Sequence, residues 1–276
     1  MAQKIWMITG ASRGFGAEIA KAVLDGGDKL IATARNVNSL DRLAKNPNVL
    51  AVALDVTDES QAKKAIDVGL KQFGSIDVLV NNAGYGLLGA VEESSAQEVE
   101  NIYRTNVFGL LNVTRAVLPC MRKQKSGYII NISSLGGYSS YPGWGIYSST
   151  KFAVEGITES LHGELAPLGI HVTVVEPGFF RTDFLDSSSL VKTATVIGDY
   201  TDTVGKMRDF AEGHNHQQPG NPSKLAQAIL QLAEAAEPPV RLPLGTDTLK
   251  RIADKNAFVD REIETWRTVA VSTDFQ

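Results

Sequence analysis

The sequence predicts an α/β fold in which one doubly wound, Rossmann-like parallel sheet carries helices on both faces. Short apolar runs alternate with longer helical patterns along the first two thirds of the 276 residues, as in parallel strands joined by crossover helices. A glycine-rich turn follows the first apolar run and leads into the first helical pattern. Because such crossovers are right-handed, this order places helices on both sides of the sheet.

The predicted strands are apolar runs that end at turn residues or polar side chains. The first leads into the glycine turn, the third ends at Asp55, and the sixth is closed by Pro177 and Gly178. We expect strands at residues 5–9, 30–34, 49–54, 78–81, 128–133 and 172–175, and a short edge strand within 238–244.

Helical patterns fill the intervals between the strands, and breaker residues mark their ends. Gly26 and Gly27 stop the first pattern, Pro47 interrupts the chain after the second, and Gly74 ends the third. Ser223 is the expected N-cap of a later helix. We expect helices at residues 17–25, 37–45, 60–73, 97–123, 152–165 and 223–236.

One domain over residues 1–276 is predicted, because no linker divides the chain. Residues 183–222 have a weak pattern and many loop signals, which are typical of a substrate loop or lid. Residues 245–276 form a C-terminal extension with a helical pattern around 256–269.

Composition narrows the classes of partner. Lys and Arg number 27 against 31 Asp and Glu, a net charge of −4 without a basic run, so neither nucleic acid nor an anionic membrane is implied. Cys120 is the single cysteine, so no intrachain disulfide is possible. No apolar run approaches the ~20 residues that span a bilayer, and the N-terminus does not read as a signal peptide. We expect a cytoplasmic protein, and no catalytic metal, since the four histidines show no ligand spacing.

Tyr147 and Lys151 are four residues apart, so on a helix they share one face. An ammonium held near a phenol lowers the phenol's pKa from about 10, which suits a general acid or base. Ser134 follows a predicted strand, where its hydroxyl can point at a substrate oxygen. Ser133 is the alternative, but strand alternation turns it to the opposite face.

The turn Thr-Gly-Ala-Ser-Arg-Gly-Phe-Gly at residues 9–16 lies where backbone N–H groups can bind a pyrophosphate at a helix N-terminus. With it the chain carries Asp55-Val56, Asn81-Asn82-Ala83-Gly84, Asn106, Ser134, Tyr147-x-x-x-Lys151 and Pro177-Gly178-x-x-x-Thr182. On these motifs the chain resembles the short-chain dehydrogenase/reductase family in its single-domain form.

The resemblance implies hydride transfer between a nicotinamide cofactor and an alcohol or carbonyl. It makes Tyr147 the general acid or base, lets Ser134 hold the substrate oxygen, and has Lys151 also bind the nicotinamide ribose. Asn106 would hold a water in a proton relay; without the resemblance it would be a satisfied amide inside a helix. The expected catalytic residues are therefore Asn106, Ser134, Tyr147 and Lys151. The expected cofactor-binding residues are Gly10, Ser12, Arg13, Gly14, Phe15, Gly16, Arg35, Asp55, Val56, Asn82, Ala83, Gly84, Tyr147, Lys151, Pro177, Gly178, Phe180 and Thr182.

Charge favours NADP over NAD. An NAD site places an acid at the end of the second strand to bind the ribose 2′-hydroxyl, but this region reads Ala34-Arg35-Asn36. Arg35 and Arg13, from the glycine turn, could pair with a 2′-phosphate. Asp55 would bind the adenine, with Asp58 as the expected cap of the next helix.

An apolar substrate is expected, because aromatic and aliphatic residues gather on loops at the C-terminal edge of the sheet. They are Tyr85, Leu87, Leu135, Tyr138, Tyr141, Trp144, Phe179 and Phe184. Of these, Leu135, Tyr141, Phe179 and Phe184 are predicted to bind substrate together with Ser134 and Tyr147.

A homodimer or homotetramer is expected, because family members pair through the two long helices and Val107, Leu110, Leu111 and Val113 put apolar side chains on more than one face. The alternative function is a cofactor-binding regulator of the same fold without significant turnover.

Overall fold

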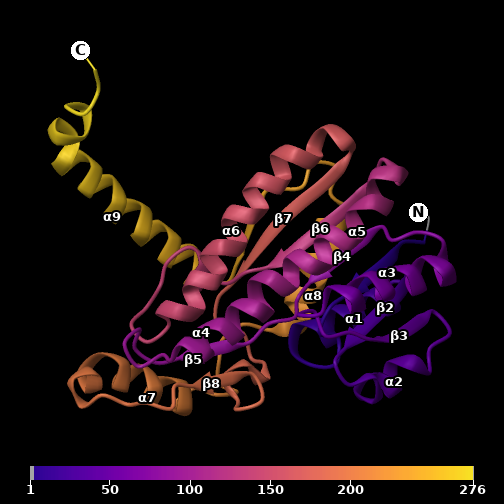
Figure 1. The fold of residues 1–276 in the computed structure, drawn as a ribbon, viewed down its shortest axis with the longest axis horizontal. Helices are drawn as coiled ribbons and strands as arrows, with labels where there is room; N and C mark the ends of the chain where they lie inside the picture. The colour runs from indigo at the N-terminus through magenta and orange to yellow at the C-terminus, as the bar shows by residue number, and fades with distance from the viewer. Residues whose placement is uncertain (1–2, 276) are drawn as a thin grey trace.

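The computed structural model describes residues 3–275 and shows a seven-stranded sheet in which every neighbouring pair of strands is parallel. The strand order is β3-β2-β1-β4-β6-β7-β9, so the chain winds outward in both directions from β1 and β4, as predicted (Figure 1). The strands are β1 (Ile5–Ile8), β2 (Lys29–Ala34), β3 (Val49–Ala53), β4 (Val78–Asn81), β6 (Gly127–Ile132), β7 (Ile170–Pro177) and β9 (Arg241–Leu244).

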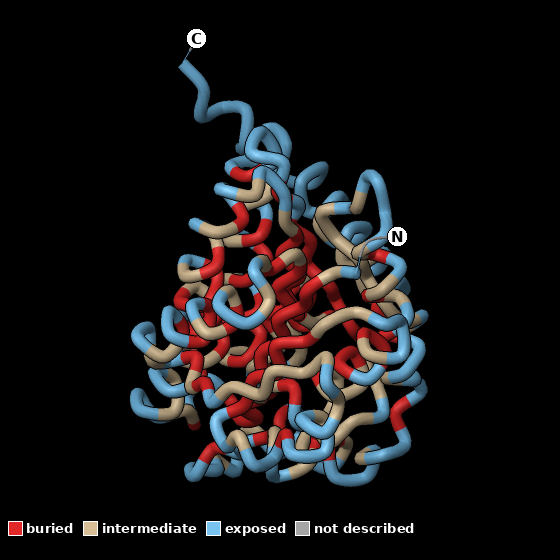
Figure 2. The backbone as a smooth tube through the Cα atoms, turned by 90° about the vertical axis from the view of Figure 1, so that its right-hand side faces the viewer, coloured by how far each residue is buried: buried red, intermediate tan, exposed pale blue. Residues whose placement is uncertain are grey.

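Alternate side chains of each strand enter two separate apolar cores, because strand periodicity is two. In β1, Trp6 and Ile8 face the core made with α1 (Gly14–Asp25) and α8 (Pro222–Glu234). Ile5 and Met7 face the opposite core. That second core is made with α3 (Glu59–Phe73), α5 (Leu110–Gln124) and α6 (Gly145–Leu165), while the short α2 (Asp41–Ala44) packs beside β3. Figure 2 shows the buried residues concentrated along the middle of the molecule.

Several helices begin before their predicted starts, and α1 begins at Gly14, three residues before 17. α6 begins at Gly145, seven residues before the expected start at 152, so Tyr147 and Lys151 both lie on regular helix. α8 is capped by Asn221, whose side chain accepts from the backbone N–H groups of Ser223 and Lys224, and not by Ser223. Pro222 occupies the first helical position, where its missing N–H costs nothing.

The helix expected over 97–123 is continuous but not uniform. α4 (Ala96–Tyr103) and α5 are joined by a π-helical turn at Arg104–Gly109, which contains Asn106. Such turns are rare and often occur at functional sites. Residue periodicity alone did not reveal it.

The weakly patterned segment 183–222 and the C-terminal extension hold more structure than expected. β8 (Leu190–Lys192) pairs in parallel with β5 (Gly86–Leu88), and α7 (Lys206–Gly213) follows. α9 (Thr246–Val271) starts ten residues before the predicted 256 and projects away from the body (Figures 1 and 2). Within residues 3–275, no helix is long and apolar enough to cross a membrane.

Candidate active site

Two cavities meet at the C-terminal edge of the sheet. The larger is a groove of about 890 Å³ that runs past the glycine turn and the ends of β2, β3 and β4. The smaller, of about 90 Å³, lies among the loops after β6 and β7. Tyr147, Thr182 and Phe184 line both cavities, so the predicted acid/base lies at their junction.

Tyr147 is 6% exposed and packs edge-on against Trp144, with ring centroids 5.6 Å apart. Burial raises the pKa of its phenol to about 12, and the nearby Ser134 hydroxyl only partly opposes this shift. The expectation that Lys151 lowers this pKa is therefore wrong for the protein alone: the Lys151 ammonium lies 5.9 Å from the ring centroid, and desolvation dominates. Tyr147 is consequently a protonated phenol at neutral pH.

Ser134 lies beside Tyr147. A Cβ placed on Gly136 would be 3.5 Å from both the Ser134 Oγ and the Tyr147 Cε1, so the two side chains converge there. The Ser134 Oγ also accepts from the Gly136 N–H at 3.0 Å, which fixes its rotamer. Ser133, the alternative, lies with its Oγ next to the Glu155 carboxylate near Gly137, as strand alternation predicts.

Lys151 is buried, and its Nζ donates to the carbonyl of Ile132 at 2.8 Å. Burial lowers the pKa of this ammonium to about 8, while the charge of Glu155 one turn further along α6 raises it. The lysine therefore titrates close to neutrality, and small changes around it decide its charge.

Asn106 lies across Gly84 from Lys151: a Cβ on Gly84 would be 3.0 Å from Asn106 Oδ1 and 3.8 Å from Lys151 Nζ. Its Oδ1 accepts from the N–H of Tyr85, and its Nδ2 donates to the Tyr85 carbonyl and to Thr150 Oγ1. The π-helical turn thus holds the backbone after β4 beside the lysine. The role of Asn106 in a proton relay stays a prediction.

The residues of the glycine turn fit a bound pyrophosphate. Gly10 and Gly14 have φ values of +67° and +54°, and a Cβ on Gly14 would meet nothing nearer than Thr182 at 4.0 Å. Arg13 occupies the N-cap of α1 without a side-chain capping bond, which leaves the first-turn N–H groups available to an anion. Gly16 has another role, because its Cβ would lie 2.3 Å from the Gly10 carbonyl oxygen beneath the turn.

Most of the predicted cofactor residues line the groove. They are Gly10, Ser12, Arg13, Gly14, Phe15, Arg35, Asp55, Val56, Asn82, Ala83, Gly84, Tyr147, Lys151 and Thr182. Pro177, Gly178 and Phe180 line the smaller cavity. Asp58 caps α3 as expected, while the Asp55 carboxylate accepts from the N–H and hydroxyl of Thr57 at the mouth of the groove.

The smaller cavity is mainly apolar and aromatic. All six residues predicted to bind substrate line it: Ser134, Leu135, Tyr141, Tyr147, Phe179 and Phe184. Trp144, from the wider group of loop aromatics, lines it as well. Tyr85 lines the groove, Leu87 lies in the packed core beneath, and Tyr138 bonds Asn256 on α9. Sequence reasoning missed Gln218, which lines this cavity from the segment after α7 and belongs to no motif.

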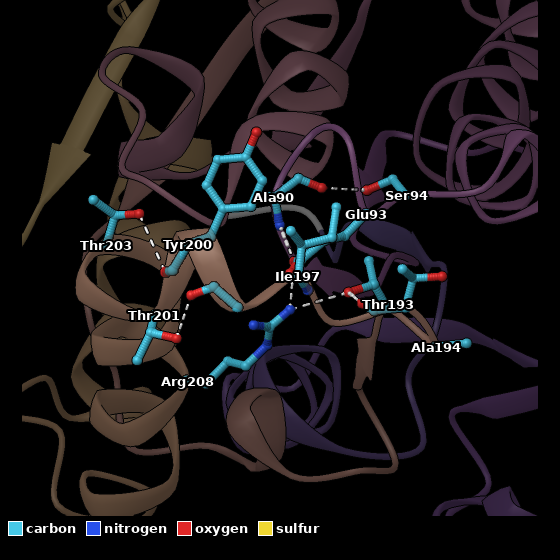
Figure 3. Close-up of polar contacts among 12 residues, drawn as sticks. Ala90, Glu93, Ser94, Thr193, Ala194, Ile197, Tyr200, Thr201, Thr203 and Arg208 are labelled. Atoms are coloured by element: carbon cyan, nitrogen blue, oxygen red, sulfur yellow. Dashed lines mark hydrogen bonds and ion pairs between the residues drawn. The ribbon is translucent and has the colours of Figure 1, made fainter.

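Glu93 connects the 183–222 segment to the rest of the protein through hydrogen bonds. Its buried carboxylate accepts from the N–H of Ala90 at 2.7 Å, the N–H of Ile197 at 2.8 Å and the Arg208 guanidinium at 2.5 Å (Figure 3). Burial raises the pKa of this carboxyl, but the three donors outweigh burial and the pKa is lowered. Glu93 is therefore an anion that holds the segment in place.

The first turns of α9 hold two loops of the smaller cavity. Asp247 Oδ2 accepts from the N–H of Phe179 at 2.7 Å. Arg251 donates to the carbonyl of Ser140 at 2.8 Å and lies 4.3 Å from the Tyr141 ring centroid. The C-terminal extension thus supports the site, which the sequence pattern did not predict. Among residues 3–275, no group of three His, Cys, Asp or Glu could hold a metal ion.

Known proteins agree with this architecture. The short chain dehydrogenase family matches residues 4–192. Oxidoreductase BOA17 of Botryotinia fuckeliana is 40% identical over 273 residues, which cover 98% of this chain and 99% of that protein. A short-chain dehydrogenase from Streptomyces avermitilis superposes with a TM-score of 0.93 at 39% identity, covering 99% of this chain and 100% of that one.

Solved neighbours bind both nicotinamide cofactors. A Burkholderia phymatum short chain dehydrogenase/reductase in complex with NAD has a TM-score of 0.82 at 25% identity, covering 94% of this chain and 95% of that chain. ElxO with NADP bound has a TM-score of 0.75 at 30% identity, and the match covers 90% of this chain and 100% of that chain.

Proposed function

This chain belongs to the short-chain dehydrogenase/reductase family and is an NAD(P)-dependent oxidoreductase; from that premise we propose that it uses NADP to interconvert a carbonyl compound and a secondary alcohol. The observation that carries the proposal is the place of Tyr147, beside Ser134 and at the junction of the groove with the smaller cavity. The substrate carbonyl would lie in the smaller cavity and the cofactor in the groove. A cytoplasmic location remains a prediction from the sequence.

The chain's own groups supply the proton. With a pKa of about 12, the Tyr147 phenol holds its proton at neutral pH and donates it to the carbonyl oxygen, which favours the reductive direction. Ser134 donates a hydrogen bond to the same oxygen and holds it near the phenol. A nicotinamide cofactor held in the groove beside the glycine turn would supply the hydride for the carbonyl carbon. Aromatic walls at Trp144 and Phe184 exclude water from the reacting atoms.

NADP is the proposed cofactor on grounds of charge. Arg13 and Arg35 line the groove and are exposed, and no acid follows β2. Arg13 already donates to the Ser188 carbonyl, and Arg35 makes no ion pair within residues 3–275. Arg35 is therefore the main candidate to bind the 2′-phosphate.

A screen of NADPH oxidation over ketones, aldehydes, steroids and quinones tests the function, with Tyr147→Phe as the comparison. The variant removes the transferable proton at almost constant volume, so turnover should fall at least ~10²-fold. Near-normal turnover in the variant, with chemistry rate-limiting, would contradict the mechanism. Cofactor binding without turnover of any of these substrates would favour the regulatory alternative.

A further inference from the structure

Gln218 is a buried amide in the wall of the smaller cavity. It is 3% exposed, it lines the smaller cavity, and neither its Oε1 nor its Nε2 has a hydrogen-bond partner within residues 3–275. A buried polar group left unpaired costs about 1–3 kcal/mol, and for this reason such groups are uncommon in folded proteins. An unpaired amide in a cavity wall is therefore a reason to look for a ligand.

The backbone around Gln218 is held firmly, so its position is not that of a loose surface loop. Its carbonyl accepts from Arg181 Nε at 3.3 Å, and the next residues pair with the chain after β7 through Gly220 N–H to Phe179 O at 3.0 Å and Arg181 N–H to Gly220 O at 2.9 Å. Phe179 in turn packs against Phe210 of α7, with ring centroids 5.6 Å apart. Gln218 is thus fixed relative to the cavity.

The cavity offers hydrogen bonds but no charge. None of the described side chains that line it is ionised at neutral pH. Its polar groups besides Gln218 are the indole N–H of Trp144 and the hydroxyls of Ser133, Ser134, Tyr141, Tyr147, Ser148 and Thr182. Burying an unpaired ion among such groups is far more costly than burying a hydrogen-bonded neutral group. The cavity therefore favours a neutral molecule.

We propose that Gln218 binds a second, neutral oxygen function of the substrate, so that the substrate is a small carbonyl compound bearing a further carbonyl or hydroxyl group. This rests on the proposed function, in which Ser134 and Tyr147 hold the reacting carbonyl. The amide can donate from Nε2 and accept at Oε1, so it pairs with either kind of oxygen group. A substrate without that group leaves the amide unpaired and binds more weakly.

The test compares 2-hexanone with 2,3-, 2,4- and 2,5-hexanedione, which share its chain length and place the second carbonyl at increasing distance. Dissociation constants are measured by calorimetry on the protein saturated with NADP⁺ and, separately, with NAD⁺, so that no reduction occurs. The variant is Gln218→Met, which keeps the length of the side chain and removes its polar atoms. The matched control is Gln217→Met, the same change at the exposed neighbouring residue.

At least one dione should bind wild type roughly 10-fold more tightly than 2-hexanone, and Gln218→Met should lose this preference while 2-hexanone changes less than ~3-fold. Gln217→Met should match wild type. Gln218→Met should not melt at a lower temperature than wild type, because no internal hydrogen bond is lost and the cost of an unpaired buried amide is removed. Equal losses for diones and 2-hexanone, or no loss, would overturn the proposal. So would failure of both Gln218→Met and Gln218→Leu to fold, since the amide would then be structural. Selective dione binding without NADPH-dependent reduction would leave this inference standing and refute only the proposed function.

Discussion

Tyr147 shows how one residue's chemistry depends on its surroundings. The four-residue spacing to Lys151 is visible in the sequence, but the sign of the pKa shift is not, because burial of the phenol outweighs the distant ammonium. A raised pKa keeps the proton on Tyr147 for carbonyl reduction. The oxidative direction needs the phenolate, so its rate should rise with pH.

Arg35 carries the cofactor prediction. Arg35→Ala should weaken NADPH binding about 10- to 100-fold and leave NADH nearly unchanged, since one charge-assisted hydrogen bond is worth about 1.5–3 kcal/mol. Ala34→Asp should go further, because a carboxylate there repels the 2′-phosphate and accepts from a free 2′-hydroxyl. Arg42→Ala is the control, an exposed cation on α2 that does not line the groove.

The prediction for Arg35→Ala, Ala34→Asp and the control is checked by measuring dissociation constants for NADPH and NADH. Calorimetry at low and at high salt gives these constants. The NADPH contact should weaken with salt because it is ionic and partly exposed. Equal wild-type affinities for NADPH and NADH, or a loss for both cofactors in Arg35→Ala, would refute the NADP assignment and leave the oxidoreductase function intact.

At the scale of elements, the site depends on segments that lie outside the first six strands. α9 reaches back to the loops after β6 and β7, and Glu93 holds the 183–222 segment beside β5. Each contact joins parts of the chain about 70 residues or more apart in sequence. Removing one contact should therefore loosen a wall of the cavity without unfolding the sheet.

Asp247→Ala should raise the KM for ketone substrates about 10-fold, because the Phe179 N–H loses a charged acceptor worth about 1.5–3 kcal/mol. Gly178→Ala should act alike, since its Cβ would lie 2.3 Å from the Asp247 carboxylate. Asp254→Ala is the control, since its carboxylate pairs with Lys250 on the exposed side of the same helix. Unchanged KM and unchanged hydrogen exchange at Phe179 in Asp247→Ala would show that α9 does not support the cavity.

Arg208→Ala should loosen the 183–222 segment by about 1.5–3 kcal/mol, seen as faster hydrogen exchange at Ile197. The matched control is Lys192→Ala, which breaks an exposed ion pair with Glu212 in the same segment. Exposed pairs contribute little, so its exchange should stay near wild type. Equal rates of hydrogen exchange at Ile197 in the two variants would show that the contact between Glu93 and Arg208 does not hold the segment in place.

Glu93 also makes the segment sensitive to acid. Its pKa is depressed in the folded protein, so its contribution to stability is complete above the ordinary glutamate pKa of about 4.3 and is lost as the pH falls through the folded value. Glu93→Gln should remove that part of the pH dependence. Thermal unfolding of both proteins between neutral and acidic pH measures it.

At the scale of the whole molecule, exposed apolar side chains bear on assembly. Val107, Leu110 and Val113, which suggested an interface, are buried within the subunit and were the wrong evidence for it. Phe108 and Phe152, 52% and 47% exposed, lie on the π-helical turn and on α6, which pack together. The outer half of α9 also exposes Phe258, Ile263, Trp266 and Val269.

We predict a homodimer through the face that carries Phe108 and Phe152. Phe152→Asp should shift a dimer to monomer at micromolar concentration, because it replaces an aromatic side chain that the interface would cover with a charge. About half of Phe152 is exposed in the subunit, so its burial in a dimer is worth about 1 kcal/mol in each subunit, and an unpaired charge in the interface adds to the loss. Leu168→Asp, at an exposed residue after α6, is the control. Sedimentation equilibrium decides the matter, and a wild-type monomer would exclude the dimer. A dimer that survives Phe152→Asp but is lost on deletion of residues 257–276 would assign the interface to α9.

The sequence alone indicated the order along the chain of the strands that form the main sheet and of the helices between them, and the glycine turn before α1. It also singled out Ser134, Tyr147 and Lys151, whose catalytic roles stay predictions. These features depend on residues close together in the chain: strand and helix periods, breakers, and a four-residue spacing on one helix. The family motifs then indicated most of the residues that line the groove. Patterns of neighbouring residues were sufficient to place the groove because the carboxyl ends of parallel strands all lie at one edge of the sheet.

The tertiary structure alone decided which distant segments complete the site. Gln218 lines the smaller cavity and Asp247 binds the backbone of Phe179 in its wall, although neither belongs to a motif. Glu93 holds the 183–222 segment through Ile197 and Arg208. It also decided the direction in which the pKa of Tyr147 moves. Burial and hydrogen-bond partners are set by contacts between residues far apart in sequence, and a local pattern carries no information about those contacts.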